Sequence, residues 1–140
     1  MPEKQKVEYS QLEAGYQFPA TSYKLDSSTV ATYLKAVEDT SCLYQDTQLV
    51  PPMAIAAYAM AALSQNISLP PGVIHVSQEL EFISTVSVND SLTSYAKVGR
   101  KQSRGKLHLL AIDLDVLNQN QEVVLTGKTT FILPEQDDGE

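Results

Sequence analysis

The sequence predicts an α+β domain in which one antiparallel sheet wraps around a buried central helix. Residues 73–133 predict the sheet, because apolar and polar side chains alternate there over several short segments, leaving one face for water. Residues 51–66 predict the helix, because their apolar side chains lie on all sides and such a helix must be covered by protein. A sheet with a single apolar face covers that helix by curling around it.

Before the central helix we expect one strand and one shorter helix. The strand falls within residues 12–25, where apolar and polar residues alternate, and Pro19 limits it to a sheet edge or a bulge. The helix falls within residues 26–39, with Asp26 among the candidates for its N-cap. Its apolar face consists of the residues spaced at i, i+3, i+4 and i+7, which are Val30, Tyr33, Leu34 and Val37.

The central helix is expected to begin at Pro51-Pro52, because the first turn of a helix has no acceptor for the N–H that proline lacks. Breakers at residues 69–72 end the region. The four strands that follow are expected within residues 73–83, 91–98, 107–117 and 122–133, with turns at 89–90, 100–105 and 118–121.

The first of these four strands carries one of the chain's two histidines. Strict alternation places His75 on the polar face beside Glu79. The apolar face of the same strand is expected to hold Ile74, Val76, Leu80 and Phe82. The turn at residues 100–105 is expected to be a long hairpin turn.

Length and charge narrow the classes of function. The 140 residues suit one domain, which we place at residues 1–134 with an acidic tail at 135–140. The net charge of −7 has the wrong sign for binding nucleic acid or an anionic membrane surface. No apolar stretch is long enough to span a bilayer, the N-terminus shows no secretory signal, and Cys42 has no second cysteine to pair with. We therefore expect a cytoplasmic protein with no metal and no cofactor.

The order of strand, helix, buried helix and four strands is that of the hot-dog fold. Residues 33–60 resemble the helix–loop–helix of MaoC-like dehydratases and (R)-specific enoyl-CoA hydratases. That family has Gly-Asp-x-Asn-Pro-x-His in the loop; here Glu38-Asp39 replaces Gly-Asp, and Tyr44 stands at the histidine. Residues 74–98 resemble the family's strand–turn–strand, and residues 50–53 resemble the helix entry of its N-terminal FAS-type subgroup.

The resemblance implies an acyl-CoA or acyl-carrier-protein substrate whose chain runs along the central helix. The implied reaction is the reversible addition of water to a trans-2-enoyl thioester, in which the family's Asp/His pair holds the water and moves its proton. Asp39 and Tyr44 occupy the catalytic positions. Because tyrosine has a pKa of about 10 and is a poor base at neutral pH, we expect weak or absent activity. Alternatively, Asp39 only caps or ends the first helix.

Two groups of residues are candidates for binding the substrate. The free N–H groups at the start of the central helix, around Pro52, Met53 and Ala54, suit a thioester carbonyl; the alternative is an ordinary buried helix start. Basic residues at the expected hairpin turn suit the phosphates of CoA or of a carrier arm; the alternative is a solvated hairpin tip. These basic residues are Arg100, Lys101 and Arg104.

Several functions remain open. The chain is either a hydratase with a variant site or a non-catalytic acyl-binding subunit of a heteromeric 3-hydroxyacyl dehydratase, whose partner supplies the histidine. Resembling domains commonly pair, so we expect a homodimer or a heterodimer with another hot-dog subunit. Neither His75 nor His108 is expected to be the base, and Cys42 is expected to be inert. A thioesterase ranks lower because residues 53–63 contain no carboxylate, and a scaffold role stays possible.

Overall fold

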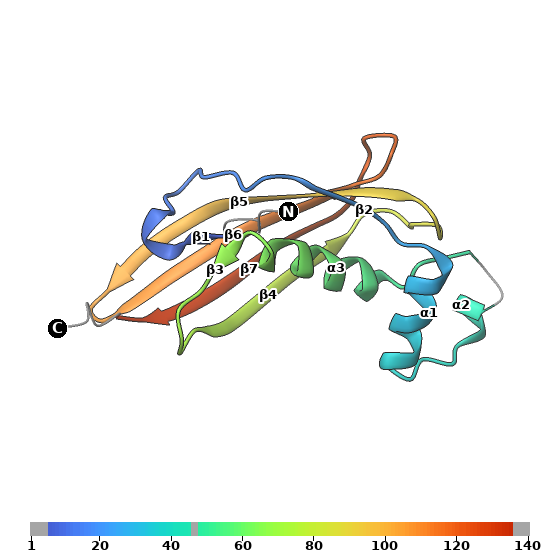
Figure 1. Cartoon of the computed structure of the whole chain (residues 1–140), viewed down its shortest axis with the longest axis horizontal. Helices are drawn as coiled ribbons and strands as arrows, with labels where there is room; N and C mark the ends of the chain where they lie inside the picture. The colour runs from blue at the N-terminus through green and yellow to red at the C-terminus, as the bar shows by residue number, and fades with distance from the viewer. Residues whose placement is uncertain (1–5, 46–47, 136–140) are drawn as a thin grey trace, which may run out of the picture.

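The computed structural model describes residues 6–45 and 48–135, apart from the side chains of Cys42 and Gln45. Residues 136–140 of the predicted tail and the side chain of Cys42 therefore lie outside the described part. The elements follow in the order (Figure 1) β1 (Val7–Glu8), η1 (Tyr9–Gln11), β2 (Thr21–Lys24), α1 (Ser27–Ala36), α2 (Cys42–Gln45), α3 (Pro52–Ser64), β3 (Ile67–Ser68), β4 (Ile74–Phe82), β5 (Ser91–Arg104), β6 (Leu107–Leu117) and β7 (Val123–Pro134).

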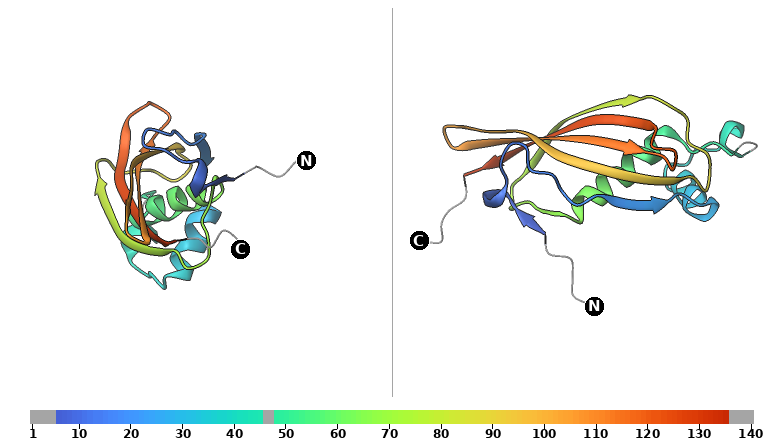
Figure 2. Two further views of the ribbon diagram at one scale, coloured as in Figure 1. Left: turned by 90° about the vertical axis from the view of Figure 1, so that its left-hand side faces the viewer. Right: turned by 90° about the horizontal axis from the view of Figure 1, so that it is seen from above.

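The main sheet of the described residues has five strands in the order β2-β5-β6-β7-β4, and each neighbouring pair is antiparallel. It curves around α3, which lies along its concave side (Figure 2). β1 and β3 form a separate, short parallel pair. The predicted α+β class, with an antiparallel sheet wrapped around a central helix, is confirmed.

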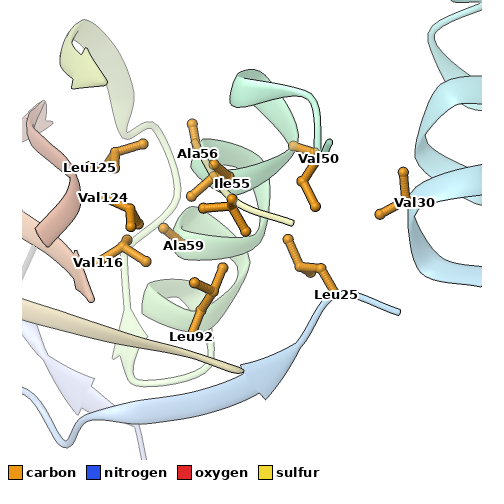
Figure 3. Packing of buried hydrophobic residues seen from close by; sticks show 12 residues of the cluster. Leu25, Val30, Val50, Ile55, Ala56, Ala59, Leu92, Val116, Val124 and Leu125 are labelled. Atoms are coloured by element: carbon orange, nitrogen blue, oxygen red, sulfur yellow. The ribbon is translucent and has the colours of Figure 1, made fainter. Parts of the chain in front are cut away.

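The core lies between α3 and the concave face of the sheet. The alanines of α3 bring its backbone close to the strands: Ala59 lies near Val116 and Leu92 (Figure 3), and it is 1% exposed. The start of α3 is also covered by α1, because Val50 lies between Val30 of α1 and Ile55 of α3 (Figure 3). Burial of these side chains, at about 25 cal/mol per Å² of apolar surface, is the main stabilisation of the domain.

The N-terminal strand starts later than predicted. Residues 12–20 contact β5 only irregularly, through bonds such as Val98 N–H to Tyr16 O (2.8 Å) and Phe18 N–H to Ala96 O (2.9 Å). Regular pairing begins at Thr21, after Pro19. The missing N–H of proline explains why the ladder starts beyond it.

The predicted long hairpin turn at residues 100–105 is wrong. An irregularity between Val98 and Arg100 resets the register of β5, and the ladder then continues as far as the pair Arg104–Leu107. The turn that remains is short, because Gly105 adopts a left-handed φ of +58° that glycine tolerates. The basic residues Arg100, Lys101 and Arg104 therefore lie on the last part of β5 and not in a loop.

The predicted face of His75 is also wrong. The register of β4 against β7 shifts between His75 and Ser77, so Val76 is an extra residue. His75 consequently lies on the concave side with Phe131, its cross-strand partner, while Ile74 is 59% exposed. One extra residue exchanges the two faces of a strand, and sequence alternation alone does not show where this happens.

Candidate functional site

The end of α1 builds the loop that carries Asp39. The N–H groups of Glu38 and Asp39 donate to the carbonyls of Lys35 (3.2 Å) and Leu34 (2.9 Å), which is the hydrogen-bond pattern of a Schellman motif. Glu38 has φ of +56°, the left-handed conformation that this motif requires. The MaoC-like pattern that this sequence resembles has glycine before the aspartate. The motif explains this, because glycine adopts this φ without strain.

Asp39 connects this helix end to α2. Its Oδ1 accepts a hydrogen bond from the Ser41 N–H at 2.9 Å, and Ser41 Oγ accepts one from the Leu43 N–H at 3.2 Å. The Tyr44 N–H donates to Ser41 O at 3.2 Å. Asp39 therefore takes part in the turn between α1 and α2, through its backbone N–H to Leu34 O and its side chain to Ser41. Whether its carboxylate also holds a water molecule stays a prediction.

Asp39 and Tyr44 act electrostatically on Tyr33, a residue that sequence analysis assigned only to the apolar face of α1. Burial raises the pKa of the Tyr33 hydroxyl, and the charges of Asp39 and Tyr44 raise it further. The predicted catalytic positions therefore share one electrostatic environment, and it contains two phenols in place of an imidazole. A neutral phenol donates a hydrogen bond readily but is a poor base at neutral pH.

The start of α3 lies at the same end of the molecule as α1 and α2 (Figure 1). The Ala54 N–H donates to Pro51 O at 2.9 Å, so it is already used. Among the bonds between described residues, the Met53 N–H has no backbone acceptor, while the prolines before it have no N–H. Met53 is 53% exposed and Pro52 is exposed, whereas Ala54 is buried. Among the described residues at the start of α3, the Met53 N–H is thus a donor without a backbone acceptor, on an exposed residue, and it suits an anionic or carbonyl oxygen.

The predicted phosphate-binding residues lie elsewhere. Arg100, Lys101 and Arg104 are on the last part of β5, at the opposite end of the chain's fold from the start of α3 (Figure 1). Lys101 is occupied: its Nζ donates to Tyr9 O (3.1 Å) and Leu12 O (2.7 Å) and lies 4.4 Å from the centre of the Tyr9 ring. Arg100 bonds Gln102, and Arg104 is exposed. Within one chain these residues do not join the Asp39–Met53 region.

A cavity of about 600 Å³ lies beside this basic strand end, and sequence analysis did not anticipate it. Its lining includes His108 and Tyr9, whose rings are 5.6 Å apart, and His108 Nδ1 is 2.7 Å from Ser103 Oγ. Burial raises the pKa of Tyr9, and its hydroxyl has no partner among the described residues. Tyr9 comes from the N-terminal segment, so only the tertiary fold brings it to His108.

Both histidines are far from Asp39. His75 is the second residue of β4 and His108 the second of β6, and both strands start at the end of the sheet away from α1 and α2 (Figure 1). Neither histidine can therefore supply the missing base to Asp39 of the same chain. The described residues also contain no group of three His, Cys, Asp or Glu side chains arranged to hold a metal ion.

Comparison with known proteins places this architecture in a family. Residues 13–127 match the model of the FAS1-like dehydratase domain region, which is more than half of the chain. The chain belongs to this family. A search of curated proteins found no match for the FAS1-like dehydratase domain described here.

Solved structures show the same fold. The FAS1-like dehydratase domain is similar to a monoamine oxidase regulatory protein from Archaeoglobus (TM-score 0.80, 17% identity, covering 98% of this chain and 100% of that one). It is similar to the R-hydratase PhaJ1 from Pseudomonas aeruginosa (TM-score 0.75, 22% identity, covering 95% of this chain and 89% of that one). It is also similar to a chain of the HadBC 3R-hydroxyacyl-ACP dehydratase complex from Mycobacterium tuberculosis (TM-score 0.63, 16% identity, covering 85% of this chain and 96% of that one).

These comparisons confirm the hot-dog fold and the MaoC-like dehydratase resemblance. The replacement of histidine by Tyr44 and the roles of the predicted site residues stay predictions. In the part of the chain that the structure covers, no helix has the length and apolar character needed to cross a bilayer.

Proposed function

We propose that this FAS1-like dehydratase domain binds an acyl thioester, carried by CoA or by an acyl-carrier protein, and has weak or no hydratase activity on its own. The observation that supports this proposal is the environment of Asp39, which is shared with Tyr33 and Tyr44 and which neither histidine reaches. The proposed setting is the cytoplasm. The reaction requires only proton transfer and carbonyl polarisation, so no cofactor is proposed.

The chemistry explains the expected loss of activity. Adding water to an enoyl thioester needs a group that takes a proton from water and a group that gives one to the α-carbon. A positioned base such as histidine contributes roughly 10²–10⁴-fold to such a step. At the position where the resemblance expects histidine this chain has Tyr44, which is half-buried. The Met53 N–H would still polarise the thioester carbonyl, so binding is expected to outlast catalysis.

Hydration of crotonyl-CoA tests this directly, followed as the loss of the enoyl absorbance. We expect wild type to be close to the background rate and a Tyr44→His variant to gain roughly 10²-fold. Tyr44→Phe is the matched control, because it keeps the ring and offers no base. High wild-type activity that survives in Tyr44→Phe would show that another group is the base. Inactivity of both wild type and Tyr44→His would contradict the placement of Tyr44.

A second candidate function is that of a non-catalytic subunit paired with another hot-dog chain. The feature that favours it is β4, an edge strand whose apolar side chains stay open to solvent: Ile74, Val76 and Phe82 are 59%, 47% and 41% exposed. The similarity to HadBC, a complex of two chains by its name, fits this proposal. In such an assembly the partner would supply the histidine, and this chain would hold part of the acyl group.

A further inference from the structure

On strands β4 and β7, the concave side of the sheet carries a group of neighbouring polar side chains, Gln78, Thr129 and His75, that the catalytic proposal does not use. Thr129 on β7 is fully buried, with 0% exposure. Gln78 on β4 is its direct cross-strand partner, and His75 lies opposite Phe131. Leu80, two residues after Gln78, packs in the same cluster as residues of α3, so this polar group faces the central helix.

The bonds within the group are incomplete. His75 Nε2 lies 2.6 Å from Thr129 Oγ1, and the His75 ring lies 5.0 Å from the Phe131 ring. Gln78 Nε2 donates to the carbonyl oxygen of Lys128 at 3.5 Å. Because a carbonyl only accepts, this contact orients the amide nitrogen toward Lys128 O. The other end, Oε1, is buried and has no hydrogen-bond partner among the described residues. A buried acceptor without a donor is unfavourable, and a ligand that donates a proton to it relieves that cost.

The position of the group relative to the thioester follows from how α3 meets β4. The Val50 N–H, just before α3, donates to Val86 O at 2.8 Å, shortly after β4 ends. The start of α3 therefore lies at the far end of β4, and Gln78 is four residues back from Phe82. At roughly 3.3 Å per strand residue this is about 13 Å. The β-carbon of an acyl thioester lies only two bonds from the carbonyl, so Gln78 would meet a more distant part of the chain.

Two apolar residues between the start of α3 and Gln78 are open to solvent. Met53 on α3 is 53% exposed, and Phe82 on the concave side of β4 is 41% exposed. Gly127, opposite Leu80, has no side chain, and a Cβ there would meet Glu79 O at 2.8 Å. This cross-strand glycine lets β4 approach β7 closely where Gln78 turns inward.

We propose that Gln78, with Thr129 and His75 beside it, is a specificity site for a hydroxyl group on the distal part of the acyl chain. This inference rests on the proposed binding of acyl thioesters. A hydroxyl donates its proton to Gln78 Oε1, whereas a saturated chain leaves that oxygen unpaired and a ketone has no proton to give. Sites built to hydrogen-bond a substrate hydroxyl discriminate strongly against analogues that lack it.

The test compares binding of ω-hydroxyacyl-CoA thioesters with unsubstituted acyl-CoA thioesters of the same length, from octanoyl to tetradecanoyl, by titration calorimetry on the full chain. At the length that reaches Gln78 we expect the hydroxylated thioester to bind roughly 10-fold more tightly, the effect of one net hydrogen bond. In a Gln78→Leu variant the preference should disappear while the unsubstituted thioester still binds. Glu79→Gln, an exposed neighbour on the convex side, is the matched control and should keep the preference.

The outcomes separate this inference from the proposed function. If both kinds of thioester bind wild type equally at every length, the hydroxyl site is wrong and the acyl-binding function stands. If neither kind binds, the proposed function fails and the hydroxyl site fails with it. A preference that persists in Gln78→Leu would assign the discrimination to another residue. Because the wild-type comparison is decisive by itself, poor folding of the variant would not protect the proposal.

Discussion

Glu38 is one of three non-glycine residues with a positive φ in the described part of the chain. Its φ of +56° places it at the left-handed position that closes α1. For a residue with a Cβ this conformation costs roughly 1–2 kcal/mol, and glycine avoids that cost. The bonds around it, from Glu38 and Asp39 to the carbonyls of α1, hold it there and determine the direction of the loop. The strain therefore lies directly beside the candidate catalytic aspartate.

We predict that Glu38→Gly raises the free energy of unfolding by about 0.5–1 kcal/mol, because relief of the Cβ contact exceeds the added freedom of the unfolded chain. Urea denaturation followed by circular dichroism measures this. Glu38→Ala is the matched control and should show no such gain, since alanine keeps the Cβ. Equal stability of the glycine and alanine variants would mean that the backbone at residue 38 is not left-handed.

The N-cap of α1 gives a prediction at the scale of an element. Asp26 Oδ1 accepts a hydrogen bond from the Thr29 N–H at 2.8 Å. Bonds from the backbone and side chain of Thr29 hold the pKa of Asp26 below its ordinary value, with a smaller contribution from the charge of Lys24. Since the pKa is lower in the folded chain, the carboxylate stabilises the fold above about pH 4, and this stabilisation is lost as the pH falls through the lowered pKa.

Asp26→Asn tests this pH dependence, because asparagine still caps the helix but does not titrate. We expect wild type to lose stability more steeply than the variant as the pH falls below about 4, measured as urea midpoints. Asp26→Ala separates the two effects, since it removes the cap and should be less stable than Asp26→Asn near neutral pH as well. Parallel pH profiles for wild type and Asp26→Asn would contradict the prediction.

The sequence predicts the type and order of the helices and strands better than which face each side chain occupies and where each strand ends. The helices at residues 27–36 and 52–64 lie within their predicted segments, because spacing of apolar residues and proline at the first turn are local signals. The extra residue at Val76 and the irregularity after Val98 depend on the partner strand. They reversed the predicted face of His75 and moved the basic residues into β5, and no local pattern marks either shift.

Across the whole molecule, the candidate site could be predicted only where it depends on neighbours in sequence. Asp39 and Tyr44 could be grouped because they are five residues apart in the sequence, whereas the short helix α2 that contains Tyr44 was not predicted, because residues 39–49 show no clean period. Whether Arg100 and Arg104 lie near Met53 depends on which end of β5 is next to the start of α3. In the structure, the end of β5 that carries both arginines and the start of α3 lie at opposite ends of the fold. The Gln78–Thr129 pair joins residues of two different strands, and only the register brings them together.

The edge of β4 gives the last prediction, because it decides whether the domain acts alone. Among the described strands β4 pairs only with β7, so its other edge presents unpaired backbone groups beside Ile74 and Val76, which are 59% and 47% exposed. Such an edge readily takes up another strand, and lysine on the edge prevents this. We predict that wild type forms dimers by sedimentation velocity and that Ile74→Lys with Val76→Lys yields monomers with an unchanged fold.

Leu107→Lys is the control for this experiment, because Leu107 is 52% exposed but lies at the β5–β6 hairpin away from the edge. If Leu107→Lys disrupts the dimer as strongly as the β4 substitutions, association does not use β4. If wild type is a monomer at high concentration, self-pairing is wrong, and the exposed edge then requires a different chain. In that case the missing histidine and the open strand would have one explanation, since the same partner would cover β4 and complete the site.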